Sequence, residues 1–201
     1  MRVPIAVSIA VLVVCASGTA NATVITPVAA TGSSEYSGFP ASDAIDTGAG
    51  RYTTDWSTNS TGNGSFLNLD LGAVYSLANA LITDRTTSGG NNGSFGGGTT
   101  DFTTQFSVQA YTNATFATTS GPALTFTKAA PSNPTTAAQF LYTALLNDMT
   151  TEFVRYTAIA GNGGINLGLA DIEFTTVPEP ASFALLVTGL IALGKLRRRN
   201  T

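Results

Sequence analysis

Short segments in which apolar and polar residues alternate are the feature of this 201-residue sequence that most constrains its fold. The clearest example runs from Asp101 to Tyr111. One expected face carries Phe102, Thr104, Phe106, Val108 and Ala110, and the other carries Thr103, Gln105, Ser107 and Gln109. Ser65–Leu71 repeats the pattern. Because alternate side chains of a β-strand point to opposite faces, both segments predict half-buried strands.

Five further segments of similar character predict additional strands: Tyr75–Thr83, Ala123–Thr127, Gln139–Leu145, Glu152–Ala160 and Leu169–Thr175. Gly72 and the pairs Gly121-Pro122 and Asn133-Pro134 are typical of the turns between strands. The Gly- and Ser-rich segment Ser88–Thr100 predicts a mobile loop, because it can bury little apolar surface. About seven short strands without a long amphipathic helix predict an all-β fold, an antiparallel sandwich of two sheets.

The first 22 residues have the pattern of a secretory signal peptide. Arg2 supplies the positive start, Ile5–Cys15 is apolar except for Ser8, and Ala20-Asn21-Ala22 has the small-residue pattern of a cleavage site. We therefore predict a signal peptide over residues 1–22, cleaved after Ala22. The alternative is a retained membrane anchor, but a spanning helix needs about 20 apolar residues and this run is shorter.

The C-terminal residues 177–201 contain three features in order. These are the extended motif Pro178-Glu179-Pro180, an apolar run over Ala181–Gly194, and a basic end with Lys195, Arg197, Arg198 and Arg199. The apolar run is shorter than a usual membrane span, and the basic residues would hold the end of the chain on the cytoplasmic side. The alternative is a permanent C-terminal anchor.

This tail resembles the PEP-CTERM sorting signal of Gram-negative bacteria. The resemblance implies transient insertion into the inner membrane, recognition by an exosortase, and delivery to the cell surface or the extracellular polysaccharide matrix. We expect the remaining residues, 23–176, to form the working domain.

The composition of that domain excludes several kinds of chemistry. The only cysteine, Cys15, lies in the predicted signal peptide and the chain has no histidine, so disulfides, thiolate nucleophiles and His-based catalysis are excluded. From Thr23 to Val177 there are four basic and eleven acidic residues, a net charge of −7. We expect no nucleic-acid partner for such a domain, which instead suits a hard cation such as calcium.

Several separate motifs resemble the discoidin-type, galactose-binding-like jelly roll. They are Ala44-Ile45-Asp46, Thr54-Asp55-Trp56, Leu69-Asp70-Leu71-Gly72, Val154-Arg155-Tyr156 and Ala170-Asp171-Ile172. The resemblance covers nearly the whole predicted domain and implies a jelly-roll sandwich with a carbohydrate-binding role.

In that family a structural calcium ion often joins the first loop to the last strand. Carried over to this chain, the resemblance implies the ligands Asp46, Thr54 and Asp171. Two departures weaken it, since Thr47 replaces the usual Gly and Asp171 replaces a longer Glu. The alternative is that Asp46 hydrogen-bonds its own turn, as Asp often does, while Asp171 lies at a strand edge.

Two residues are candidates for ligand contact. Trp56, the only tryptophan, is expected either to pack in the core or to stack on a sugar. Arg85 is expected to bind ligand hydroxyl or carboxylate groups, whereas Arg155 is expected to pair with a nearby carboxylate.

Two acidic pairs, Asp43 with Asp46 and Asp171 with Glu173, are close in sequence. Such closeness does not provide the fixed separation that glycoside hydrolysis requires, so we predict no enzyme and no catalytic residue. The first hypothesis for function is therefore an exported module that binds extracellular polysaccharide. The second is a structural, glycosylated surface protein without a specific ligand.

Overall fold

A computed structural model describes residues 22–46, 55–59, 62–85, 101–130 and 140–177, which all belong to one unit, Ala22–Val177. The elements in chain order are β1 (Val24–Ile25), β2 (Ala29–Gly32), the 3₁₀-helix η1 (Ala41–Ile45), β3 (Trp56–Ser57), β4 (Phe66–Asp84), β5 (Thr103–Tyr111), β6 (Leu124–Thr127), β7 (Leu141–Gly161) and β8 (Gly168–Thr176). No helix among these residues has the length and apolar character to cross a membrane. The predicted sorting tail from Pro178 onward, the segment Ser88–Thr100 and all of the predicted signal peptide except Ala22 lie outside the described residues.

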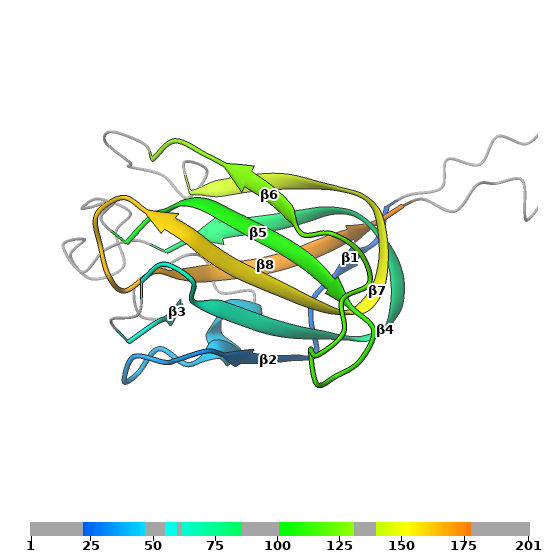
Figure 1. Cartoon of the computed structure of the whole chain (residues 1–201), viewed down its shortest axis with the longest axis horizontal. Coiled ribbons are helices and arrows are strands. Elements are labelled where there is room, and N and C mark those ends of the chain that lie inside the picture. Colours follow the sequence, from blue (N-terminus) through cyan, green and yellow to red (C-terminus); the bar gives the residue numbers. More distant parts are fainter. Residues whose placement is uncertain (1–21, 47–54, 60–61, 86–100, 131–139, 178–201) are drawn as a thin grey trace, which may run out of the picture. The chain divides into compact units, whose positions relative to one another are not determined.

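Two long strands, β4 and β7, belong to both layers of the fold, and Figure 1 shows both curving around one end of the domain. The first half of β4 lies between β2 and the second half of β7, and β5 and β6 extend this sheet. The second half of β4 lies between β8 and the first half of β7, while β1 and β3 pair with β8. All these pairings are antiparallel, which confirms the predicted sandwich.

The bend in β4 lies at Gly72. Its φ of +77° is in the left-handed region that glycine adopts readily, and its backbone N–H donates to Asp70 Oδ1 at 2.7 Å. The pairing register with β7 shifts between Asp70 and Tyr75, as expected where a bulge bends a strand. The local turn therefore redirects the strand without ending it.

The core lies between the two sheets. Its largest fully buried side chains include Trp56, Tyr156, Phe106, Phe140 and Phe174. Phe106 stacks on Phe126 and Tyr156 with ring centroids 5.2 and 5.3 Å apart, so β6 packs against the same core. On the opposite side η1 contacts both β2 and β8, with Ala41 and Ala44 buried. The core is thus covered by β6 on one side and by η1 on the other.

The predicted alternation is confirmed except at the start of β5, and two predicted strand boundaries are wrong. Thr103 is 0% exposed although its spacing predicts the face opposite Phe106, because the pairing register with β7 shifts between Thr103 and Gln105. Leu67, Leu69 and Leu71 are buried, and so are Phe106 and Val108. The segments Ser65–Leu71 and Tyr75–Thr83 form one strand, and Gln139–Leu145 joins Glu152–Ala160 in β7. The residues predicted to form turns instead form bends within continuous strands, because strand pairing continues on both sides of each bend.

Gly168, the first residue of β8, permits a close approach between two strands. A Cβ at this position would overlap the carbonyl oxygen of Trp56, which belongs to the facing strand β3. The position therefore requires glycine, because a side chain would not fit between the two strands. Gly64 differs, since its φ is +86° and no atom lies within 4 Å of its Cβ position.

Substituting these two glycines separates steric overlap from backbone strain. We expect Gly168→Ala to lower the free energy of unfolding by about 2–3 kcal/mol, because β3 and β8 must move apart. Gly64→Ala should cost about 1 kcal/mol, the penalty of a left-handed alanine. Urea unfolding measures both values, and equal losses would contradict the assigned role of Gly168.

Candidate functional site

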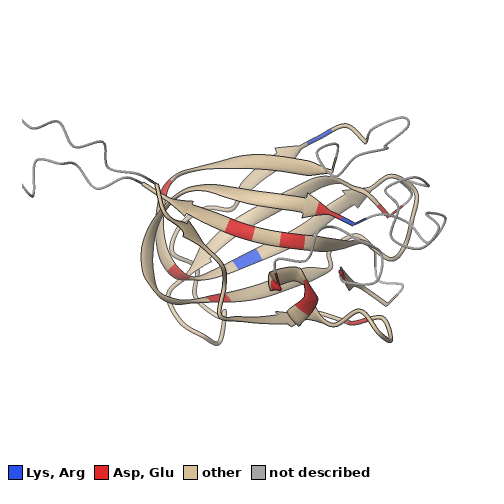
Figure 2. Ribbon diagram, turned by 180° about the vertical axis from the view of Figure 1, so that it is seen from behind, with Lys and Arg blue, Asp and Glu red and all other residues tan. Residues whose placement is uncertain are grey.

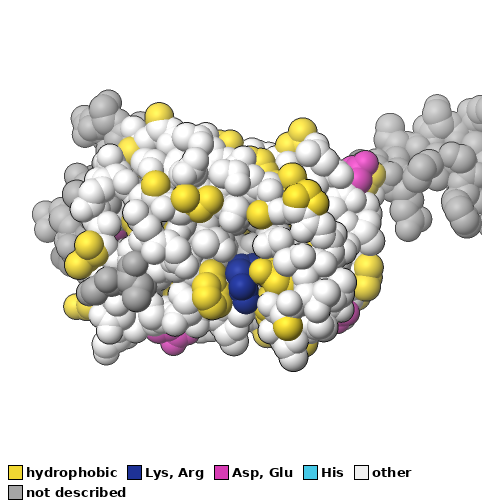
Figure 3. All heavy atoms as spheres, in the orientation of Figure 1, with side chains coloured by type: hydrophobic (Ala, Val, Ile, Leu, Met, Phe, Trp, Pro, Cys, Tyr) yellow, Lys and Arg dark blue, Asp and Glu magenta, His cyan; other side chains and the backbone are white. Residues whose placement is uncertain are grey.

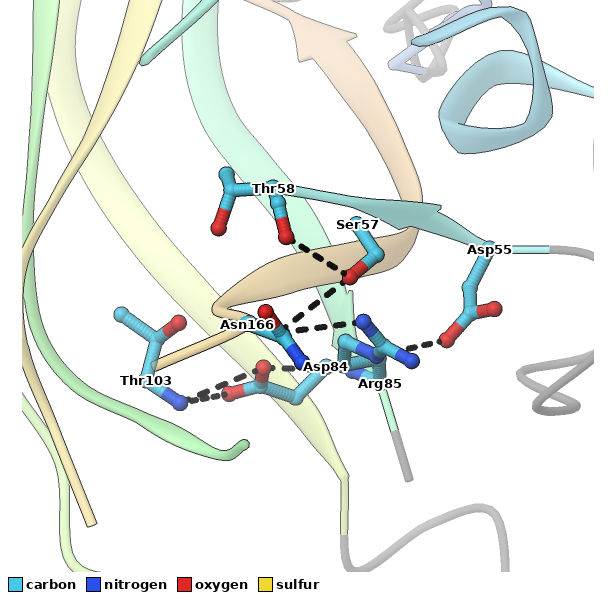
Figure 4. A network of polar contacts seen from close by, with 7 residues as sticks. All are labelled: Asp55, Ser57, Thr58, Asp84, Arg85, Thr103 and Asn166. Carbon is cyan, nitrogen blue, oxygen red and sulfur yellow. Dashed lines mark hydrogen bonds and ion pairs between the residues drawn. The ribbon is translucent and has the colours of Figure 1, made fainter. Parts of the chain in front are cut away.

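One end of the sandwich carries a buried polar cluster. There the last residue of β4, Asp84, pairs with Leu169 of β8, and Thr103 of β5 pairs with Gly161 of β7. Figure 4 shows the seven residues of the cluster and their contacts. The cluster consists of Asp55, Ser57, Thr58, Asp84, Arg85, Thr103 and Asn166. We call this end of the domain, where β4 ends and β5 begins, the loop end.

Arg85 and Asp55 form a buried ion pair in this cluster. Arg85 Nε lies 2.9 Å from Asp55 Oδ2, and the two side chains are 2% and 0% exposed. Arg85 Nη1 also donates to the Asn166 carbonyl oxygen at 3.0 Å, and its guanidinium lies 5.2 Å from the ring centre of Phe39. Burial raises the pKa of Asp55 to about 8, and the attraction of Arg85 opposes this rise. The pair connects β3 to the end of β4.

Neither predicted ligand-binding residue is available at the surface in this structure. Trp56 is 0% exposed and its indole N–H donates to the Ser34 carbonyl oxygen at 3.1 Å, so the structure favours core packing over sugar stacking. Arg85 is enclosed, and its guanidinium contacts Asp55 and Asn166. Both side chains are buried and contact neighbouring residues inside the domain.

Among the described residues, Arg85 has a carboxylate partner and Arg155 does not. Arg155 has no carboxylate partner among the described residues; its Nε donates to Asn68 Oδ1 at 2.7 Å. Its guanidinium lies 4.2 Å from the ring centre of Phe66 and 4.8 Å from that of Tyr111. The prediction that Arg155 pairs with an acid is therefore wrong, because its neighbours across β4 and β5 are Asn68 and Gln109.

A groove lies beside Arg155 on the outer face of the sheet that contains β2, β4 and β5. Its cavity of about 180 Å³ is lined by Ala29, Ala30, Thr31, Asn68, Asp70, Ala114, Phe116 and Phe153. We call it the Phe116 groove. Figure 3 shows on one face of the domain a basic side chain in a hollow between hydrophobic side chains, consistent with this arrangement.

Phe116 has a strained backbone at the edge of this groove. Its φ is +52°, a conformation that costs a bulky residue about 1–2 kcal/mol. Its ring lies 5.9 Å from that of Phe153 and 5.6 Å from the Arg155 guanidinium. The turn is held by Asn113, whose carbonyl oxygen accepts from the Phe116 N–H at 3.1 Å. Sequence reasoning missed this groove because Phe116 lies outside every alternating segment.

The predicted calcium ligands lie only in part within the described residues. Thr54 lies outside them, whereas Asp46 ends η1 and Asp171 lies on β8. Asp171 Oδ1 is buried and forms no hydrogen bond with the described residues. Burial first, then the charges of Glu173 and Asp46, raise the pKa of Asp171 to about 7. A cation would relieve this repulsion.

No cluster of three Asp or Glu residues that could bind a metal is present in the described ranges. Figure 2 shows the acidic positions spread over several strands and η1, and the basic positions are fewer. The remaining oxygen ligands would have to come from backbone carbonyl groups, hydroxyl groups or water. The calcium ion therefore stays a prediction.

Two family sequence profiles match this chain. The F5/8 type C domain matches residues 29–171, and the PEP-CTERM protein-sorting motif matches residues 176–199. The second motif is a sorting signal of exported proteins of Gram-negative bacteria. None of the curated proteins matches the sequence.

Solved structures with the same fold include sugar-binding modules. A family 32 carbohydrate-binding module from C. perfringens NanJ, solved with galactose, is 22% identical, with a TM-score of 0.55 over 77% of this chain and 99% of that one. A Streptococcus pneumoniae fucose binding module is 15% identical, with a TM-score of 0.57 over 78% and 96%. The lectin domain of lectinolysin complexed with Lewis B antigen is 16% identical, with a TM-score of 0.54 over 74% and 92%. At these identities the likeness shows the fold.

A double-mutant cycle tests the buried ion pair. Asp55→Ala should lower the free energy of unfolding by about 3–5 kcal/mol, because it leaves the Arg85 guanidinium buried without its carboxylate. Arg85→Met alone should also be costly, whereas the double variant should lose clearly less than the sum. Urea unfolding of the four proteins measures the coupling, and additive losses would show that the pair contributes nothing.

Proposed function

The chain belongs to the F5/8 type C domain family, and from this membership we propose that it is an exported, non-catalytic protein that binds carbohydrate in the extracellular polysaccharide of its own cell. The observation that carries the proposal is the presence of two parts in one sequence, a folded domain and a sorting motif. A domain with the fold of sugar-binding modules covers residues 29–171, and a sorting motif follows directly over residues 176–199.

The sorting motif supports the cellular part of the proposal. An exosortase would recognise the tail during its transient insertion in the inner membrane and remove it, and the domain would remain at the cell surface or in the matrix. The signal peptide predicted over residues 1–22 would start this route.

The Phe116 groove is the sugar-contact surface that we propose among the described residues. Sugar sites combine an aromatic surface with a few well-placed polar groups. The groove supplies the Phe116 and Phe153 rings, the Asn68 amide and the Asp70 carboxylate, next to the guanidinium of Arg155. Arg155 has no carboxylate partner among the described residues, and a guanidinium group suits the hydroxyl or carboxylate oxygens of a glycan.

Calcium is proposed as a structural ion between Asp46 and Asp171. It would be held by oxygen ligands from the end of η1 and from β8, and would connect two segments far apart in the chain. The hydroxyl group of Thr54 completes the ligand set that the family resemblance implies. The buried Oδ1 of Asp171 supports the proposal, because it lacks a hydrogen-bond partner among the described residues.

Binding to glycans tests the proposed function. The exported protein should be retained by the polysaccharide of the producing bacterium and bind a subset of sugars on a glycan array. Phe116→Ala should weaken the affinity about tenfold, because a ring that stacks on a sugar contributes about 1.4 kcal/mol. Isothermal titration calorimetry with the best glycan measures the change.

Tyr36→Ala is the control, since Tyr36 is an aromatic residue that is 43% accessible and lies outside the groove, whereas Phe116 is half-buried in it. It should bind as the wild type does. Equal affinity of Phe116→Ala and wild type would place the sugar elsewhere on the domain. Failure of the wild type to bind any polysaccharide, together with added hexose in its intact mass, would instead favour a structural, glycosylated surface protein.

The pH dependence of stability tests the calcium site. Without metal, the folded state holds the Asp171 proton up to a pKa of about 7, compared with 3.8 for an ordinary Asp, so stability should fall as the pH rises between these values. Calcium binds the ionised carboxylate, so it should stabilise the protein more at pH 8 than at pH 5. A hundredfold excess over Kd should add about 2.7 kcal/mol.

Thermal unfolding with calcium and with EDTA measures this difference. Asp171→Asn should abolish the calcium response, whereas Asp148→Asn, at an exposed position of β7, should keep it. A wild-type melting temperature that does not respond to calcium at pH 8 would contradict the site.

A further inference from the structure

Lys128 and Asp84 form a second buried charged pair at the loop end. Lys128 Nζ lies 2.5 Å from Asp84 Oδ2, and the side chains are 5% and 0% exposed. Asp84 is the last residue of β4 and Lys128 directly follows β6, so the pair joins two strands that are not neighbours in either sheet. Neither the proposed carbohydrate site nor the calcium site uses this pair.

Aromatic rings enclose the lysine amine. Nζ lies 4.7 Å from the ring centre of Phe102, 5.4 Å from that of Phe106 and 5.7 Å from that of Tyr142. Apolar surroundings disfavour separated charges and exclude water. Burial raises the pKa of Asp84, which favours its neutral acid form. Transfer of one proton from Nζ to Oδ2 would leave an amine facing a carboxylic acid.

The geometry suits an attack of that amine on the carboxyl carbon. Oδ2 is bonded to Cγ, so Nζ lies near the separation of about 3–3.5 Å from which bonds form. The Arg85 backbone N–H donates to Asp84 Oδ1 at 3.2 Å, and the Thr103 N–H points at both oxygens, at 3.4 and 3.2 Å. Figure 4 shows these two N–H groups at the Asp84 carboxyl group. They would stabilise the negative oxygen of a tetrahedral intermediate.

We propose that Lys128 and Asp84 are joined in the exported protein by an intramolecular isopeptide bond. Neutral Nζ attacks Cγ of the protonated carboxyl group, and the new C–N bond forms as the Cγ–Oδ2 bond breaks. Oδ2 leaves as water, with its own proton and one proton from Nζ. The products are one amide and one water molecule, and no oxidant, reductant or other reactant is needed.

Such a bond would connect the ends of β4 and β6 next to the loop end. The domain has no cysteine after Ala22, so a disulfide cannot do this. A covalent link between distant residues restricts the unfolded chain, and therefore stabilises the folded state as a disulfide does. In the folded domain the aromatic rings would also protect the amide from hydrolysis.

Tryptic digestion of the exported, denatured protein tests the bond. Trypsin cleaves after Arg51, Arg85, Lys128 and Arg155 in the unmodified domain, but it does not cleave after an acylated lysine. We expect the peptide Tyr52–Arg85 joined to Thr86–Arg155, with a mass one water molecule below the sum of the two. Fragmentation should place the link between Asp84 and Lys128.

Lys128→Arg is the matched control, because it keeps the positive charge while a guanidinium does not condense with the acid. Cleavage after position 128 should return, the linked peptide should disappear and the melting temperature should fall. Asp84→Ala should likewise free Lys128 for cleavage, whether or not this variant folds. An unmodified peptide Thr86–Lys128 as the main product from the wild type would overturn the proposal, and the pair would then be a buried ion pair.

Discussion

The antiparallel pairing of β4 with β7 is the constraint on which the rest of the structure depends. The two strands stay paired from Phe66 to Thr83 and bend together where the register shifts after Asp70. Because each strand continues from one sheet into the other, the two layers cannot separate without breaking a shared ladder. Every other strand is attached to this pair directly or through one neighbour, and the core residues of both layers are positioned by it.

The loop end shows how the domain accommodates charge inside an apolar sandwich. Arg85 and Lys128 are each enclosed with one carboxylate, and each also contacts aromatic rings. An unpaired charge at either position would carry the full desolvation penalty, so the two pairs fix which strand ends meet. Arg155 is the opposite case, because its neighbours are an amide and aromatic rings on an outer face. The same residue type is therefore enclosed with a carboxylate at position 85 and lies on an outer face at position 155.

The sorting motif and the domain of this protein occupy separate parts of the sequence, residues 176–199 and 29–171. The motif is a short linear pattern, whereas the domain is a folded unit. A groove formed by β2, β4 and the turn at Phe116 depends on residues that no short segment contains. This explains why the sorting motif could be recognised in one stretch of sequence, whereas the groove could be identified only in the folded domain.

Local pattern was sufficient to predict the strand faces, the sandwich and the family, because alternation and short motifs are properties of neighbouring residues. Leu67, Leu69, Phe106 and Val108 are buried as their alternation predicts. The sequence could not predict that Gly72 bends a strand without ending it, because that depends on β7 continuing alongside. Nor could it assign Arg85 to the interior, Arg155 to a groove or Lys128 to Asp84. By itself, the sequence determined which apolar residues face inward and that the chain carries a sorting motif of exported proteins. Only the tertiary structure decided which distant charged residues meet. The alternation of side chains along a strand specifies the face on which each residue lies, but it does not specify the partner strand.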